Sequence, residues 1–157
     1  MRFIATICAA LISACALRQG VGEQSTDFTV PGTADSLLSR ARGELAELGY
    51  TISPTEHQQR MVLTEPRPIP DSLAVDTATT RGQLWVLRVT GANNVFSAGA
   101  HGTVEAFLIP PATAASPGNV ILQTATPVTA RRTPALFREL QRVAGVIQAA
   151  VTRGARP

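Results

Sequence analysis

Lysine is absent from this chain of 157 residues, and histidine, cysteine and aromatic residues are scarce, with two histidines, two cysteines and 4% aromatic content. All 14 basic residues are therefore arginines, which are set against 11 acidic residues for a formal charge of +3. Exclusive use of arginine fits a phosphate- or carboxylate-binding surface, but a GC-rich genome explains it more simply. Only Arg131 and Arg132 are adjacent, so the basic cluster of a nucleic-acid-binding protein is missing and we expect no nucleic-acid partner.

Motifs for catalysis and metal binding are lacking as well. His57 and His101 lie in separate segments without acidic or cysteine neighbours at metal-ligand spacing, and the chain has no Gly-x-Ser-x-Gly turn to present a nucleophile. Residues 97–102 are glycine-rich but lack the lysine of a phosphate loop, so we predict a flexible β-turn. Glu56 and Glu65 are expected to be solvated. We predict no enzyme, metal or cofactor, while a hydrolase with a site assembled from distant residues stays open.

The hydrophobic run at the N-terminus is short. It covers residues 3–12, after Met1 and Arg2, and small residues follow it. Ten residues span about 15 Å as a helix, against roughly 30 Å for a bilayer core, so a membrane-spanning helix is excluded. The pattern predicts a secretory signal peptide over residues 1–14.

The four residues Ile12, Ser13, Ala14 and Cys15 resemble the lipobox of bacterial lipoproteins. The resemblance implies cleavage between Ala14 and Cys15 and attachment of lipid to Cys15, which would anchor the chain to a membrane through two or three acyl chains. An ordinary signal peptide with a different cleavage site is the alternative. Cys8 would leave with the peptide, so no disulfide is expected. Residue 16 is alanine, which in the enterobacterial rule of this family implies the outer membrane, facing the periplasm.

The mature chain is expected to begin with a flexible linker over residues 15–26 and to continue as one domain over residues 27–154. A short strand at 27–30 precedes an amphipathic helix at 34–48, with Thr33 as its N-cap and Gly49 in a left-handed conformation at its end. A second amphipathic helix at 134–152 begins with Thr133 as cap and Pro134 in the first turn. The helices therefore stand near the two ends of the domain.

Strand-like segments lie between the two helices. Tyr50 and Ile52 begin a strand that forms a hairpin with residues 61–63, and the proline-rich segment 65–81 is predicted as a long, mobile, irregular loop. Residues 83–90 form the most β-like stretch, with a turn at 91–94, and further strands are expected at 103–109 and 119–128. This order predicts an α+β fold in which an antiparallel β-sheet has two helices packed on one face.

The segment Val30, Pro31, Gly32 before the first helix, and residues 47–52 after it, resemble the helix-grip domains of bacterial envelope lipoproteins such as BamC. In that arrangement the last helix lies across a curved sheet, and an apolar groove between them could be lined by Trp85, Phe107 and Phe137. The alternative is that all three are ordinary core residues, because so few aromatic residues are available.

The sequence therefore favours a membrane-anchored, periplasm-facing lipoprotein with a non-catalytic role in envelope protein interaction or assembly. Contact with the partner protein is expected through the loop 65–81 or an exposed strand edge. The alternative function is a carrier that holds a small apolar ligand or lipid between helix and sheet.

Overall fold

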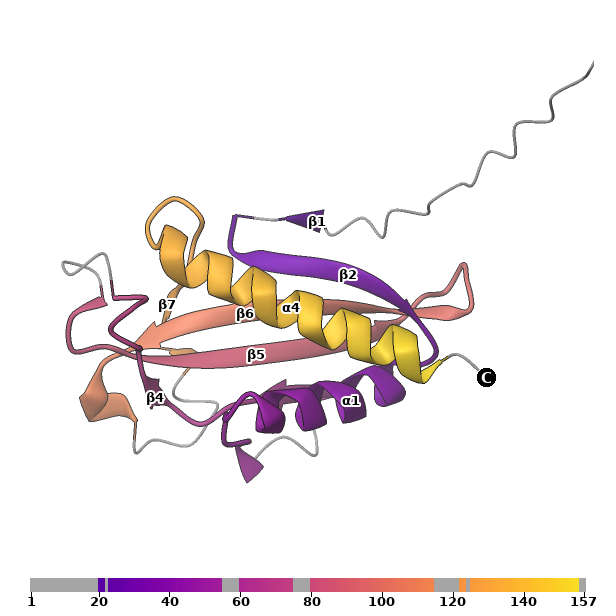
Figure 1. The fold of residues 1–157 in the computed structure, drawn as a ribbon, viewed down its shortest axis with the longest axis horizontal. Coiled ribbons are helices and arrows are strands. Elements are labelled where there is room, and N and C mark those ends of the chain that lie inside the picture. Colours follow the sequence, from indigo (N-terminus) through magenta and orange to yellow (C-terminus); the bar gives the residue numbers. More distant parts are fainter. Residues whose placement is uncertain are drawn as a thin grey trace, which may run out of the picture.

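Two helices cover one face of an antiparallel sheet in the computed structural model, which describes residues 20–21, 23–54, 60–74, 80–114, 122–123 and 125–155 (Figure 1). Within these residues the sheet has seven strands, and its main order is β1-β2-β6-β5-β3, with β4 beside β5 and β7 beside β6. The predicted α+β class and the placement of both helices on one face are confirmed. The strands are β1 (Gly20–Val21), β2 (Ser25–Pro31), β3 (Met61–Leu63), β4 (Arg67–Pro68), β5 (Leu84–Asn93), β6 (Gly99–Ile109) and β7 (Thr126–Pro127).

Helix α1 (Ala34–Glu47) closely matches its prediction because its end signals are local. Thr33 accepts a hydrogen bond from the Ser36 backbone, and the Ser36 side chain accepts one from the Thr33 backbone, which completes a capping box. Gly49 has a φ of +81°, the left-handed conformation expected after the helix end. The apolar stripe faces the sheet, with Leu37, Leu38, Ala41 and Leu45 all buried.

Helix α4 (Pro134–Gly154) runs two residues past its predicted end. Thr133 occupies the N-cap position, but the predicted side-chain cap is wrong, because its hydroxyl donates to the Thr129 carbonyl and accepts from the Thr129 N–H instead. The helix lies along β2 and beside α1 (Figure 1). Its buried stripe includes Leu136, Leu140, Val143 and Ile147, so the stripe expected from the sequence is the face that meets the sheet.

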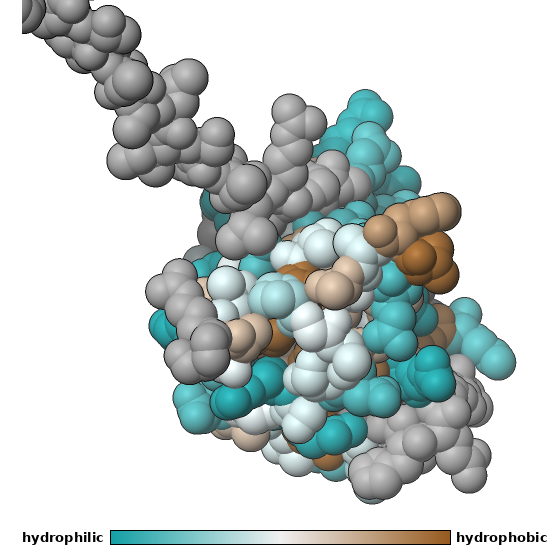
Figure 2. Space-filling view, turned by 90° about the vertical axis from the view of Figure 1, so that its right-hand side faces the viewer, coloured by the Kyte–Doolittle hydropathy of each residue, from teal (hydrophilic) through white to brown (hydrophobic). Residues whose placement is uncertain are grey.

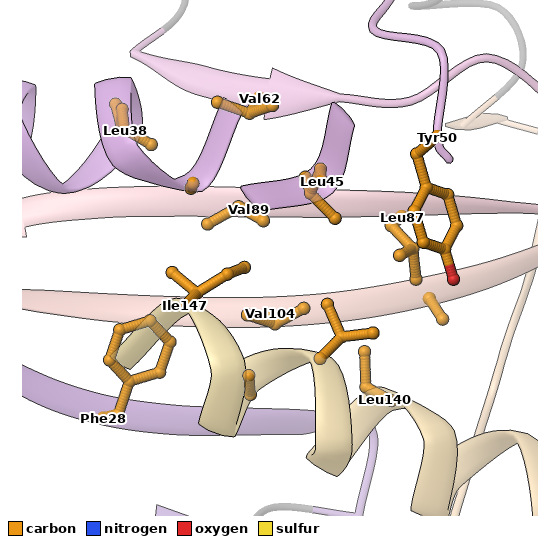
Figure 3. Packing of buried hydrophobic residues seen from close by; sticks show 14 of the residues in the cluster. Phe28, Leu38, Leu45, Tyr50, Val62, Leu87, Val89, Val104, Leu140 and Ile147 are labelled. Carbon is orange, nitrogen blue, oxygen red and sulfur yellow. The ribbon is translucent and has the colours of Figure 1, made fainter. Parts of the chain in front are cut away.

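The core lies between the helices and the inner face of the sheet. Alternate residues of β5, namely Trp85, Leu87 and Val89, point into it, and even-numbered residues of β6 join them. Figure 3 shows Leu45 of α1, Ile147 of α4 and Val89 of β5 converging on this space. The outer face carries a small second cluster in which Leu63, Val86 and Ile109 are buried.

The central hairpin is longer than expected. Gly91, Ala92 and Asn93 are predicted as a turn, but they belong to β5 and pair with β6, and residues 99–102 are strand rather than a flexible β-turn. The chain reverses only at residues 94–98. Glycine is the misleading signal, because here Gly102 provides space for packing: a Cβ on it would lie 2.6 Å from the ring of Phe28.

Other boundaries also shift. Residues 20–21 and 25–26 are expected in the flexible linker, but they form paired strand. The strand predicted to begin at Tyr50 is reduced to one bridge between Ile52 and Thr64, and, among the described residues of the strand predicted at 119–128, only Thr126 and Pro127 are strand. These segments pair at the ends of longer strands, so tertiary contacts rather than local pattern set their limits.

Candidate functional site

The predicted lipid-attachment residue Cys15, with Ala14 beside it, lies outside the described residues, as do Glu56 and His57. The described chain begins at β1, where Gly20 pairs with Asp27 and Val21 pairs with Thr26. Gly20, the first strand residue, is therefore five positions after Cys15 (20 − 15 = 5), with four residues between them. A lipid on Cys15 would hold the domain on a tether much shorter than the linker predicted from the sequence.

The three aromatic residues proposed to line a groove do not lie together. Trp85 and Phe137 are core residues, with 1% and 3% of their surface exposed. Phe107 lies on the opposite face of the sheet, because strand residues alternate between faces and its neighbour Leu108 joins the inner core. The Arg88 guanidinium carbon lies 5.0 Å from the centre of the Phe107 ring. The groove of Trp85, Phe107 and Phe137 expected from the sequence is therefore wrong.

Asp27, His101 and Thr103 come together on the outer face of the sheet, although Asp27 and His101 are 74 positions apart in the sequence (101 − 27 = 74). The Thr103 hydroxyl donates to Asp27 Oδ1 at 2.7 Å, and His101 Nε2 lies 3.8 Å from the same oxygen. The Thr103 hydroxyl is bonded to the carboxylate, and 3.8 Å is too long for a hydrogen bond between His101 Nε2 and the same oxygen. The geometry is that of a half-exposed hydrogen-bonded cluster, and among the described residues no group of three or more metal-ligating side chains gathers.

The start of α4 carries three arginines around one pocket. A pocket of about 360 Å³ is bordered by Arg131, Arg132 and Arg138, with Leu73 of the 65–81 segment on its other side. The described residues that line it include no carboxylate. The sequence showed that Arg131 and Arg132 are adjacent, and the structure shows that Arg138 of α4 lines the same pocket. The pocket could receive a carboxylate against an apolar wall.

The proline-rich segment beside this pocket is docked over its described part. Residues 67–68 form β4 against β5, and the Arg67 guanidinium carbon lies 4.3 Å from the centre of the Tyr50 ring. Ile69 and Leu73 pack against the core. The expectation of an irregular loop throughout is therefore corrected at residues 67–68, whereas 65–66 and 69–74 have no regular secondary structure.

Two apolar side chains project at the opposite end of the molecule. Val95 and Phe96, at the tip of the β5–β6 hairpin, have 86% and 95% of their surface exposed. Figure 2 looks at this end and shows brown side chains projecting from the rim of a mostly teal and white surface. Sequence patterns missed this tip because they placed the turn three residues too early.

The scan against protein-family models finds no match, and no curated protein matches the chain. Within the described residues, no helix is both long and apolar enough to cross a bilayer. The function of the chain is therefore inferred from its own residues.

Proposed function

We propose that this protein is a lipid-anchored lipoprotein of the cell envelope, at the outer membrane and facing the periplasm, with a non-catalytic role in contacting another envelope protein. The observation that carries the proposal is the placement of Ile12, Ser13, Ala14 and Cys15 at the end of an apolar run too short to span a membrane. A folded α+β domain begins only five residues beyond the cysteine. Lipid on Cys15 would hold this domain at the membrane surface.

The anchor is tested by intact mass and membrane partitioning of the full chain expressed in a bacterial host, beside a Cys15→Ala variant. The wild type should carry the added mass of a diacylglycerol and sediment with membranes, whereas the variant should be unmodified and remain in the soluble fraction. If both proteins are soluble and without lipid, the proposal is wrong and the cysteine is a thiol on a secreted domain.

The pocket at the start of α4 is the surface we propose for the protein partner. Arg131, Arg132 and Arg138 line it without a carboxylate among its described lining residues, so an acidic segment of another envelope protein would be its complement. Leu73, which is partly buried, and the exposed Pro134 supply apolar contact within the same pocket. The pocket lies at the opposite end of α4 from the hairpin tip, where it can face away from the membrane.

Partner binding is tested by cross-linking in membranes followed by mass spectrometry. The double variant Arg132→Gln and Arg138→Gln should lose most of any cross-linked partner. Arg153→Gln, which removes one exposed charge from the last turn of the same helix, should retain it. Equal recovery of the partner by both variants would place the contact elsewhere.

A carrier of a small apolar ligand is the second candidate, and one observation favours it. The indole N–H of Trp85 is buried between helix and sheet and has no hydrogen-bond partner among the described residues. A buried unpaired donor is costly, and a ligand acceptor atom would satisfy it. Native mass spectrometry of the protein from its membrane should then show an added mass that Trp85→Phe diminishes; an unliganded mass would dismiss this candidate.

A further inference from the structure

The hairpin tip at residues 94–98 is a fixed projection. The Asn94 side chain accepts a hydrogen bond from the Phe96 N–H at 2.9 Å, and the Asn94 N–H donates to the Gly99 carbonyl at 2.9 Å. One residue earlier, Asn93 Oδ1 accepts from the Ala34 N–H at 2.7 Å, which ties the base of the hairpin to the start of α1. Phe96 is therefore held in solvent by local bonds, although its exposed ring gains nothing from that position within the domain.

The tip is also uncharged. Residues 89–100 contain no acidic or basic side chain, and Val95 and Phe96 stand beside asparagine and serine. This composition suits the boundary between lipid headgroups and acyl chains, where an apolar side chain can enter the bilayer while polar neighbours stay hydrated.

The direction of β1 places its N-terminal end on the side of this tip. Because β1 is antiparallel to β2, Gly20 is the residue of β1 nearer to the Pro31 end of β2, and Pro31 pairs with Gly99 at the base of the tip. Gly20 pairs with Asp27, and Asp27 pairs with Thr103 of β6. Thr103 is four residues from Gly99 along β6 (103 − 99 = 4), which is a distance of about 13 Å at ~3.3 Å per residue. The five residues from Cys15 to Gly20 can span up to roughly 17 Å. Cys15 can therefore reach the level of Gly99 at the base of the tip, beyond which Val95 and Phe96 project.

We propose that Val95 and Phe96 form a second membrane contact, inserting into the same bilayer leaflet as the acyl chains on Cys15. This inference rests on the proposed lipid anchor. The tether raises the local concentration of the tip at the bilayer, so that two side chains that would bind weakly by themselves are sufficient. The sheet would then stand with its hairpin toward the lipid and with the arginine-lined pocket at the start of α4 pointing away from it.

The test uses a single fluorescent label on the full, lipidated chain. Lipidated Cys15 would leave no other cysteine in the mature protein, so Ser97→Cys introduces a unique thiol beside Phe96 while keeping both apolar side chains. The labelled protein is placed in vesicles of phosphatidylethanolamine and phosphatidylglycerol, with and without lipids that carry a quencher on the acyl chain. Arg131→Cys, which carries the same label at the far end of the molecule, is the control.

We expect strong quenching by the lipid probe at residue 97 and at least several-fold weaker quenching at residue 131. Adding Val95→Ser and Phe96→Ser to the Ser97→Cys protein should reduce its quenching several-fold without releasing the protein from the vesicles. These two serine changes lie in an exposed turn, so far-ultraviolet circular dichroism should be unchanged.

Three other results would overturn the inference. Equal quenching at the two positions, or no effect of the serine changes, would show that the tip does not enter lipid, although the protein is still anchored. Protection of residue 97 from an aqueous quencher without quenching by the lipid probe would indicate that a second copy of the chain, rather than lipid, covers the tip. Failure to find lipid on Cys15 by intact mass would instead remove the proposed anchor itself, so the two failures are distinguishable.

Discussion

At the scale of the residue, Tyr50 makes the stability of the core depend on pH. Burial, partly offset by the Arg67 charge, raises its pKa from 10.0 to about 12. Below pH 10 the phenol is neutral in both the folded and the unfolded state, so its full contribution to the free energy of unfolding is present. Between pH 10 and 12 the phenol ionises in the unfolded state but stays neutral in the folded state. The free energy of unfolding should therefore fall as pH rises through this window, by at most about 1.4 kcal/mol per unit.

This alkaline loss is open to a direct measurement because the chain has one tyrosine and no lysine. Urea unfolding at pH 9.5 and pH 11, followed by tryptophan fluorescence, should show the loss in the wild type. The Tyr50→Phe variant should show much less of it. An identical loss in both proteins would assign the effect to another group.

Gly102 is predicted to tolerate no side chain. A Cβ there would lie 2.6 Å from Phe28 and 3.0 Å from Leu37, and overpacking of this kind costs about 1–3 kcal/mol. Gly102→Ala should therefore lower the free energy of unfolding by about that amount. Gly43 is the control, because it is exposed in α1 and a Cβ added to it would meet no atom within 4 Å, and Gly43→Ala should stabilise by about 0.5–1 kcal/mol. If both substitutions changed the free energy of unfolding in the same direction, close packing around Gly102 would not be the cause.

At the scale of the element, α1 depends on a cap that is partly local and partly distant. Thr33 caps the Ser36 N–H, and Asn93 of β5 accepts from the Ala34 N–H. Thr33→Ala should destabilise the protein by about 1 kcal/mol, the usual loss for an N-cap. Thr152→Ala, which removes a hydroxyl bonded within α4 to the Gln148 carbonyl, should cost less, as chemical denaturation of both variants would show. Equal losses would mean that the Thr33 cap has no special role.

At the scale of the whole molecule, α1, α4 and the inner face of the sheet share one apolar cluster. No part of it can be exposed without removing contacts from the others, so we predict one cooperative unfolding transition. Trp85 is the only tryptophan and is 1% exposed in this cluster. Its fluorescence and the far-ultraviolet circular dichroism should therefore change at the same urea concentration, and separated midpoints would indicate two independently folding parts.

The two ends of the molecule also differ in chemistry. One end presents Val95 and Phe96 on a rigid tip, and the other presents three arginines around a pocket at the start of α4. A membrane contact at the first end would leave the second open to a protein in the periplasm. The distribution of apolar and basic side chains thus agrees with a protein that links a membrane surface to a partner.

The sequence by itself determined the two helices and the fold class. Helices are specified by contacts within one or two turns, so the apolar stripes, the capping position of Thr33 and the glycine at residue 49 were sufficient. The alternation of Trp85, Leu87 and Val89 likewise placed these three residues on one side of β5, which the structure shows to be the side that faces the helices. The lipobox-like residues at the N-terminus remain a prediction drawn from the sequence alone.

Only the tertiary structure decided where strands end, which residues share a surface and where the apolar tip projects. Strand pairing joins positions far apart in the chain, so Gly91 and Gly102 read locally as turn residues although they face each other in the ladder. For the same reason Asp27 meets His101, and Phe107 lies on the face opposite Trp85 and Phe137. Register assigns each strand residue to one face or the other, and register depends on partners that no local pattern contains.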